Sequence, residues 1–251
     1  MSLFARKAKP ATVFEEPPAT HQVPQSQAPA LTSLVKKAAI SLEKKGLLGT
    51  RAAVYLVADR SGSMAGHYQS GAVQRLAEQT LGLSANLDDD GIVPVIFFDN
   101  VAYPAVEVSL DDYRGVITRE HQRLGSMGGT RYDAAINAVI RHYTAAKATD
   151  PAFVVFQTDG EPNPGTEDLV RSAIRSASAL PIFWSFLGFG SHFAFLQDLD
   201  TLDRRVVDNA SLFAVGDHPA NLTDAELYDG LMHEFPQWLA AARTKGILAT
   251  P

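Results

Sequence analysis

The sequence predicts an α/β fold in which helices cover both faces of a doubly wound, mostly parallel central sheet. One observation is that residues 53–58, 92–98, 152–157 and 180–187 form near-continuous apolar runs. Such runs are typical of strands that are buried on both faces of a sheet. A second observation is that helix-like segments alternate with these runs along the chain. This alternation favours parallel strands joined by helical crossovers.

Two weaker strand-like segments extend the prediction to the edges of the sheet. Residues 102–108 follow the 92–98 strand after a short turn through Asp99 and Asn100. A connection of this length favours a hairpin, so we expect 102–108 to be an antiparallel edge strand. Residues 211–215 are a further weak strand candidate.

The first helix is expected to begin near Leu31, where apolar residues first recur at helical spacing. Ser33 is a suitable N-cap for this helix, and Gly46 is a suitable terminator. The later helices are predicted at about 69–85, 111–120, 131–147, 166–178, 191–200 and 223–243.

The last predicted helix, 223–243, carries two local signals. Thr223 and Glu226 have the spacing of a capping box, in which each side chain binds the other residue's backbone amide. Pro236 should kink the helix or split it in two, because proline lacks the amide hydrogen that a helix interior requires.

Residues 1–30 are predicted to be a disordered, proline-rich tail, and residues 31–251 to form one domain. The tail shows no hydrophobic period, so it cannot bury enough apolar area to offset the entropy lost on ordering. The remaining length is sufficient for a single α/β domain with a substantial core.

Composition excludes several classes of protein. The net charge of −6 argues against a nucleic-acid partner, since such proteins usually carry a basic stripe. The absence of cysteine excludes disulfide scaffolds, thiolate metal sites and cysteine nucleophiles. The sequence shows neither a secretory signal nor an uninterrupted apolar stretch that could span a membrane. We therefore expect a cytoplasmic location.

Oxygen-bearing side chains follow two of the predicted strands. Asp59, Ser61 and Ser63 come at the end of the 53–58 strand, and Asp159 follows the 152–157 strand; Thr130 opens a predicted helix. In an open α/β sheet, ligands bind past the carboxyl ends of the strands, where the strand order reverses. Hard divalent cations such as Mg²⁺ prefer oxygen ligands. We therefore expect a cation site built from these residues.

Most of these residues also have a purely structural interpretation. The two serines would suit an N-cap, Thr130 with Asp133 has the spacing of a capping pair, and Asp159 before glycine is common in turns. Asp59 is different, because a carboxylate at the end of an apolar strand is costly to desolvate without a cation. The cation hypothesis depends on the residues converging.

The motifs resemble the metal-ion-dependent adhesion site of von Willebrand factor A (vWA) domains. The matching segments are Asp59-Arg60-Ser61-Gly62-Ser63-Met64, Gly129-Thr130 and Thr158-Asp159-Gly160. The resemblance extends from about residue 31 to the C-terminus. The segments Gly128-Gly129-Thr130-Arg131-Tyr132-Asp133 and Glu234-Phe235-Pro236-Gln237-Trp238-Leu239 are similar to the bacterial tellurium-resistance (TerF-like) branch, which is related to the copine type.

This resemblance implies a Rossmann-like vWA fold and binding rather than catalysis. It implies that Ser61, Ser63 and Thr130 bind Mg²⁺ directly, with Mn²⁺ or Ca²⁺ as possible substitutes. Asp59 and Asp159 would act mainly through bound waters. One coordination position would remain for an acidic residue of a partner protein. The branch implies a role in tellurite or related chemical-stress resistance.

Two alternatives and three residue roles stay open. A metal-dependent phosphoester hydrolase is the main alternative, although such enzymes hold Mg²⁺ through several carboxylates. A cation that only stabilises the fold is the other. Glu161, Asp99 and His67 lie near the predicted site, and the sequence does not assign them a role.

Overall fold

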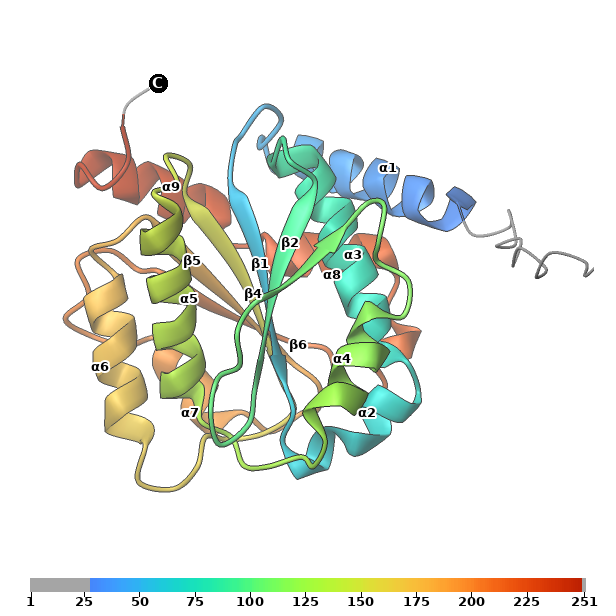
Figure 1. Ribbon diagram of the computed structural model, residues 1–251. Coiled ribbons are helices and arrows are strands. Elements are labelled where there is room, and N and C mark those ends of the chain that lie inside the picture. The colour runs from blue at the N-terminus through green and yellow to red at the C-terminus, as the bar shows by residue number, and fades with distance from the viewer. Residues whose placement is uncertain (1–27, 250–251) are drawn as a thin grey trace, which may run out of the picture.

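The computed structural model describes residues 28–249 and shows one central sheet in this part of the chain (Figure 1). Six strands lie in the order β3-β2-β1-β4-β5-β6. All neighbouring pairs are parallel except β2 and β3, which are antiparallel. The prediction of a mostly parallel sheet with one antiparallel edge strand is therefore confirmed. The strands are β1 (Ala53–Asp59), β2 (Ile92–Phe98), β3 (Val106–Ser109), β4 (Ala152–Thr158), β5 (Ile182–Gly188) and β6 (Ala210–Ala214).

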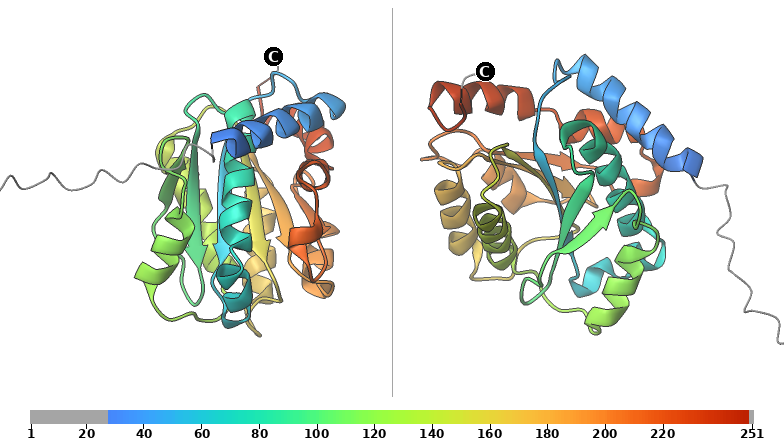
Figure 2. Two further views of the ribbon diagram at one scale, coloured as in Figure 1. Left: turned by 90° about the vertical axis from the view of Figure 1, so that its right-hand side faces the viewer. Right: turned by 45° about the horizontal axis from the view of Figure 1, so that its top comes forward.

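Helices cover both faces of this sheet, as the two rotated views also show (Figure 2). One face packs against α1 (Ala28–Lys44), α2 (Ala65–Gln69), α3 (Ala72–Leu87), α4 (Val116–Leu124), α8 (Asp224–Leu231) and α9 (Phe235–Thr244). The other face packs against α5 (Tyr132–Ala146), α6 (Glu167–Ala177) and α7 (Ala194–Asp200). Two short 3₁₀ turns, Gly62–Met64 and Pro219–Asn221, complete the described elements.

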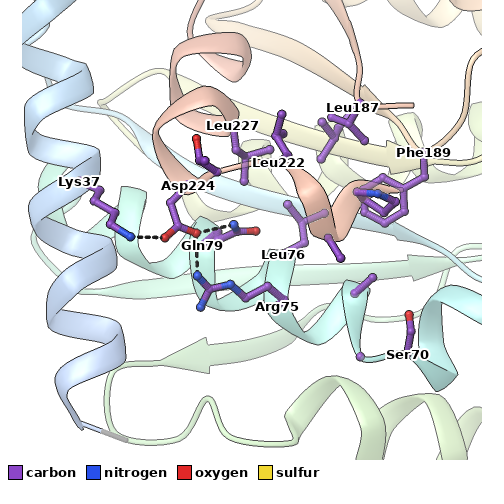
Figure 3. A pocket seen from close by; sticks show the side chains of 16 residues that line it. Lys37, Ser70, Arg75, Leu76, Gln79, Leu187, Phe189, Leu222, Asp224 and Leu227 are labelled. Carbon is purple, nitrogen blue, oxygen red and sulfur yellow. Dashed lines mark hydrogen bonds and ion pairs between the residues drawn. The ribbon is translucent and has the colours of Figure 1, made fainter. Parts of the chain in front are cut away.

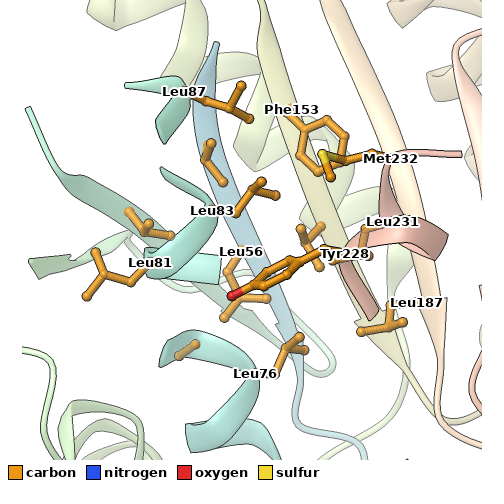
Figure 4. Close-up of a cluster of buried hydrophobic side chains, with 14 of the residues drawn as sticks. Leu56, Leu76, Leu81, Leu83, Leu87, Phe153, Leu187, Tyr228, Leu231 and Met232 are labelled. Atoms are coloured by element: carbon orange, nitrogen blue, oxygen red, sulfur yellow. The ribbon is translucent and has the colours of Figure 1, made fainter. Parts of the chain in front are cut away.

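Alternate side chains of the central strands point into two separate cores. In β1, Leu56 belongs to the core beneath α3 and α8, whereas Val57 belongs to the core beneath α5. Figure 4 shows Tyr228 of α8 lying over the sheet among leucines of α3. Its buried hydroxyl donates to the backbone carbonyl of Gln79 at 3.0 Å. Burial on both faces explains why the strands read as continuous apolar runs.

The first helix begins earlier than predicted. It starts at Ala28, so the N-cap assigned to Ser33 is wrong, because Ser33 lies inside the helix. Leu31 already packs against the core, which extends the helix N-terminally. The helix ends at Lys44, and Gly46 follows with a φ of +68°, as expected for a terminator. Residues 1–27 of the predicted tail lie outside the described residues.

Other helix boundaries are set by glycines in the left-handed region. Gly71, at a φ of +79°, delays the start of α3 to Ala72, whereas a helix over 69–85 was expected; the short helix α2 before it was not predicted. Gly115, at a φ of +66°, delays the start of α4 to Val116, whereas a helix over 111–120 was expected. The predicted division of the last helix is confirmed, since α8 ends at Leu231 and α9 begins at Phe235, with Pro236 in the first turn of α9.

Successive strands are added on one side of β1 as far as β3 and on its other side from β4 onward, so the strand order reverses at β1. Strand β2 lies on one side of β1 and β4 lies on the other. The helical connections leaving the carboxyl ends of β1 and β4 therefore diverge, which opens a crevice between these two strand ends. The candidate site lies in this crevice.

Candidate metal centre

Asp59 is the last residue of β1 and is completely buried. Its Oδ1 accepts a hydrogen bond from the Ser61 amide at 2.6 Å, and its Oδ2 accepts one from Thr158 Oγ1 at 2.6 Å. Burial raises the pKa of Asp59 to about 7, although the hydrogen bonds from Thr158 and Ser61 oppose this shift. No lysine, arginine or histidine in residues 28–249 forms an ion pair with Asp59. A bound cation would supply the positive charge that this carboxylate lacks.

Ser61, Ser63 and Asp159 converge from the ends of β1 and β4. Ser63 Oγ donates to Asp159 Oδ1 at 2.8 Å, and the hydroxyl oxygens of Ser61 and Ser63 are 3.1 Å apart. Ser61 Oγ donates to the same Asp159 oxygen at 3.5 Å. Neighbouring ligands of an octahedral Mg²⁺ at its usual bond length are about 3 Å apart. The spacing of these oxygens therefore fits a shared hard cation.

Thr130 is brought to the same crevice by its backbone. The Gly62 amide donates to the Gly128 carbonyl at 3.0 Å, which pairs the two loops. Thr130 is two residues further on, so its Cα lies within about 7.6 Å of the Cα of Gly128. Asn163, which follows β4, accepts from the Thr130 amide at 2.8 Å. The Thr130 hydroxyl has no hydrogen-bond partner among residues 28–249, which leaves it available for a ligand.

Three polar residues that support these loops were not singled out from the sequence. Asn100 Oδ1 accepts from the Gly129 amide at 3.0 Å, and Asn163 Oδ1 accepts from the Thr130 amide at 2.8 Å. Thr158 Oγ1 accepts a hydrogen bond from Tyr132 Oη at 2.9 Å and donates one to the buried carboxylate of Asp59 at 2.6 Å. Thr158 is part of the matched motif, which was the signal available in the sequence. The two asparagines had no comparable signal, because their partners are far away in the chain.

The three residues whose roles were left open have different surroundings. The Glu161 carboxylate accepts from the Phe195 amide in the first turn of α7, at 3.3 and 3.2 Å. The His67 ring lies against the Phe189 ring, with 5.0 Å between centroids. Asp99 forms a buried ion pair with Arg60. None of these contacts places the side chain among the converging oxygens.

The donor set is mixed rather than purely acidic. In the described part of the chain there is no group of three or more His, Cys, Asp or Glu side chains arranged to hold a metal. A site at the end of β1 therefore requires the hydroxyls as ligands. Neutral hydroxyls leave much of the charge on a bound cation, so such a site would still attract an anionic ligand.

A separate pocket of about 510 Å³ lies between α1, α3 and α8 (Figure 3). Apolar side chains such as Leu76, Leu187 and Leu227 line one part of it. Asp224 occupies the other part, where it binds Lys37, Arg75 and Gln79. The pocket contains none of the predicted cation ligands, so it is distinct from the crevice.

The family model for the vWA domain found at the TerF C-terminus matches residues 51–248. The chain belongs to this vWA-TerF-like family. The resemblance inferred from the motifs is thereby confirmed at the level of both the domain and its branch. This vWA domain is a member of a family of metal-dependent adhesion-type modules that mediate protein interactions.

Two curated relatives have similar sequences. The Bacillus subtilis protein YcbR, described as uncharacterized, is 38% identical over 218 residues, which cover 85% of this chain and 88% of that protein. The Synechocystis protein sll0103, also described as uncharacterized, is 30% identical over 137 residues, which cover 55% of this chain and 32% of that protein.

Among solved structures, proximal thread matrix protein 1 of the mussel byssus has a similar fold. Its TM-score is 0.53 at 15% identity, and the match covers 73% of this chain and 47% of the mussel chain. The vWA domain therefore spans about half the length of that protein. A second structure of the mussel protein has zinc in its metal-ion-dependent adhesion site, with a TM-score of 0.51, 15% identity, and 72% and 48% of the two chains covered. At this identity the likeness shows the fold alone.

None of the helices within residues 28–249 combines the length and the apolar character needed to cross a membrane.

Proposed function

We propose that this vWA domain is a divalent-cation-dependent protein-interaction module. Ser61, Ser63 and Thr130 would bind the cation directly, and Asp59 and Asp159 would hold it mainly through water. The observation that carries the proposal is the 2.8 Å contact between Ser63 Oγ and Asp159 Oδ1, which joins the ends of β1 and β4. An acidic residue of a partner protein would complete the coordination of the cation.

Mg²⁺ is the proposed cation, with Mn²⁺ and Ca²⁺ as substitutes. Every proposed ligand atom is an oxygen, and Mg²⁺ prefers oxygen ligands in compact octahedral geometry. The zinc found in the corresponding motif of the mussel protein supports divalent-cation binding by this fold. The hydroxyls and carboxylates of this chain would position the cation and balance part of its charge. The cation would in turn attract the partner's carboxylate.

A role in bacterial tellurite or chemical-stress resistance is the finer part of the proposal. Its support is the match to a domain found in TerF. A cytoplasmic location stays a prediction, which cell fractionation would test. Loss of tellurite tolerance after deletion of the gene, restored by the wild-type gene and not by Thr130→Ala, would support the resistance role.

Isothermal titration calorimetry with Mg²⁺, Mn²⁺ and Ca²⁺ tests the site itself. Ser61→Ala and Thr130→Ala should each weaken cation binding by at least about tenfold, because each removes a proposed ligand. Thr144→Ala is a matched control, since Thr144 is exposed near the other end of α5 and its hydroxyl donates to the Ile140 carbonyl of the same helix. Wild-type protein that binds none of the three cations would contradict the proposal.

Partner binding is tested by capture from lysate with and without chelator. Capture should require the cation, fail in Thr130→Ala and be competed by acetate, which supplies a bare carboxylate. Equal capture in the presence of chelator would exclude a metal-bridged partner. If the cation raises thermal stability but supports no partner, its role is to stabilise the fold.

The hydrolase alternative has no specific observation in its favour. vWA domains are mostly interaction modules, and His67, the base candidate near the site, packs against Phe189. Turnover of a generic phosphoester by pure protein, lost in Ser61→Ala, would replace the binding proposal with this alternative.

A further inference from the structure

Arg60 lies between two proposed site residues in the sequence, yet its side chain is completely buried and binds elsewhere. Arg60 Nη1 donates to Asp99 Oδ2 at 2.9 Å, and Nη2 donates to the Gly125 carbonyl at 2.7 Å. The guanidinium carbon lies 5.6 Å from the centroid of the Tyr103 ring. Tyr103 Oη also donates to Asp99 Oδ2, at 2.9 Å. The guanidinium is therefore fixed from several sides.

These contacts join three loops around the crevice. They are the serine loop (60–63), the β2–β3 turn (99–103) and the α4–α5 loop (125–131), which carries Thr130. The α4–α5 loop is also bound directly to the other two. The Gly128 amide donates to the Arg60 carbonyl at 3.2 Å, and the Arg131 amide donates to the Asp99 carbonyl at 2.9 Å. Backbone and side chain of Arg60 thus contact the loop at different points.

We propose that Arg60 is a positioning residue that holds the α4–α5 loop at the distance from the serine loop at which both reach one cation. Its action on the cation passes through Thr130, which it does not touch. The expected effect of Arg60 on cation affinity rests on the proposed function. Its role in holding the α4–α5 loop in position does not. Asp99, whose role the sequence left open, is the carboxylate that holds the Arg60 guanidinium in place. We call the contacts of the Arg60 side chain with Asp99 and with the Gly125 carbonyl the brace.

The shape of the arginine side chain makes the proposal specific. Its planar fork binds two acceptors in fixed directions, whereas the lysine ammonium is a compact point charge. Arg60→Lys would keep a positive charge beside Asp99 but would not reach Asp99 and the Gly125 carbonyl together. It therefore removes the brace without leaving an unpaired buried carboxylate, which would itself be strongly destabilising.

The first test is carried out in the cation-free protein, by amide hydrogen exchange. The amides of Gly128, Gly129 and Thr130 are all hydrogen-bonded and should be protected in the wild type. In Arg60→Lys these amides should lose protection, while the amides of β4 keep theirs. Asp99→Asn keeps an oxygen acceptor for Arg60 but removes the opposite charge, so it should act in the same way. Tyr103→Phe removes the hydrogen bond from Tyr103 to Asp99 without removing a charge, and it decides the result if neither of these variants folds.

The second test measures Mn²⁺ affinity by calorimetry. Arg60→Lys and Asp99→Asn should each weaken binding by at least about tenfold, as expected when a residue that orients a ligand is altered. In a Thr130→Ala background, Arg60→Lys should weaken binding no further. A general loss of stability would instead add to the effect of Thr130→Ala.

Asp224→Asn serves as the control, because Asp224 is also a buried partner of an arginine but lies away from the crevice. It should lower stability and change neither the exchange of residues 128–130 nor the Mn²⁺ affinity. Unchanged exchange in both brace variants would overturn the proposal, as would full additivity with Thr130→Ala. Faster exchange in a protein that binds no cation would reject the proposed function while supporting the brace.

Discussion

Thr158 of β4 donates its hydroxyl to the buried carboxylate of Asp59 on β1, with 2.6 Å between Thr158 Oγ1 and Asp59 Oδ2. The two residues end neighbouring parallel strands. Tyr132 Oη in turn donates to Thr158 Oγ1, at 2.9 Å. Because the hydroxyl accepts one hydrogen bond and donates the other, it helps to orient the carboxylate through Oδ2, while the Ser61 amide binds Oδ1.

Replacement of Thr158 by valine should weaken cation binding and leave the fold intact. Valine has nearly the same shape but no hydroxyl, so Asp59 Oδ2 loses its donor and the carboxylate is then held through the bond from the Ser61 amide to Oδ1. We expect about tenfold weaker Mg²⁺ binding and a loss of about 1–3 kcal/mol of stability. Thr158→Ser keeps the hydroxyl and should bind like the wild type. Calorimetry that finds equal affinities for the valine and serine variants would contradict this role.

The convergence of the site could be predicted from the sequence because it follows from the sheet. Asp59 and Asp159 each stand at the carboxyl end of a buried strand, and these strands proved to be neighbours. The serine pair follows the first strand directly, so its position required no further information. The 2.8 Å contact between Ser63 and Asp159 is the result. That a cation binds there stays a prediction.

The supporting contacts could not be predicted, because they depend on how distant loops approach each other. Asn163 reaches back to the Thr130 amide, and Arg60 reaches across to Asp99 and Gly125. Nothing in the local sequence indicates either partner. The predicted start of the first helix was wrong for a related reason. Ser33 is a good N-cap by residue type, but packing of Leu31 against the core extends the helix beyond it.

Gly82 allows α1 to pack closely against α3. A Cβ at Gly82 would lie 2.8 Å from Leu34 Cβ and 3.2 Å from the Leu34 carbonyl carbon, so the α1 backbone would have to move. Gly82→Ala should therefore destabilise the protein by about 1–3 kcal/mol despite the better helix propensity of alanine. Urea unfolding followed by circular dichroism measures the change.

Gly66→Ala is the matched control for this prediction. Gly66 also lies in a helix, but a Cβ there would meet no atom within 4 Å. The substitution should be neutral or stabilise by up to about 1 kcal/mol. If Gly82→Ala behaved like Gly66→Ala, the close approach of α1 and α3 would not be a constraint on the fold.

The capping box predicted at Thr223 is present at the start of α8. The Thr223 hydroxyl accepts from the Glu226 amide at 3.3 Å, and the Glu226 carboxylate accepts from the Thr223 amide at 2.9 Å. Thr223→Ala should cost about 1 kcal/mol of stability, whereas Thr223→Ser should cost little. Thermal unfolding compares the three proteins. An unchanged melting temperature in the alanine variant would show that the cap does not limit the stability of α8.

Asp224 links three helices at the polar part of the pocket between α1, α3 and α8 (Figure 3). Its carboxylate accepts from Lys37 at 2.7 Å, from Arg75 at 2.6 Å and from Gln79 at 2.8 Å. Burial raises the pKa of Asp224, but the hydrogen bonds from Lys37 and Gln79 and the charge of Arg75 outweigh burial, so the pKa lies below its ordinary value.

This lowered pKa fixes the sign of a pH effect on stability. The unfolded chain binds a proton at the ordinary Asp value of 3.8, and the folded chain binds it only at lower pH. The contribution of Asp224 is therefore fully present above about pH 5 and is lost as the pH falls below 3.8 and through the folded pKa. Asp224→Asn should cost about 1–3 kcal/mol at pH 7, because it removes charged hydrogen bonds. Urea unfolding at pH 7 and at pH 3 should show a smaller difference between the two proteins in acid. A difference that stays constant with pH would mean that Asp224 contributes through its shape and neutral hydrogen bonds rather than its charge.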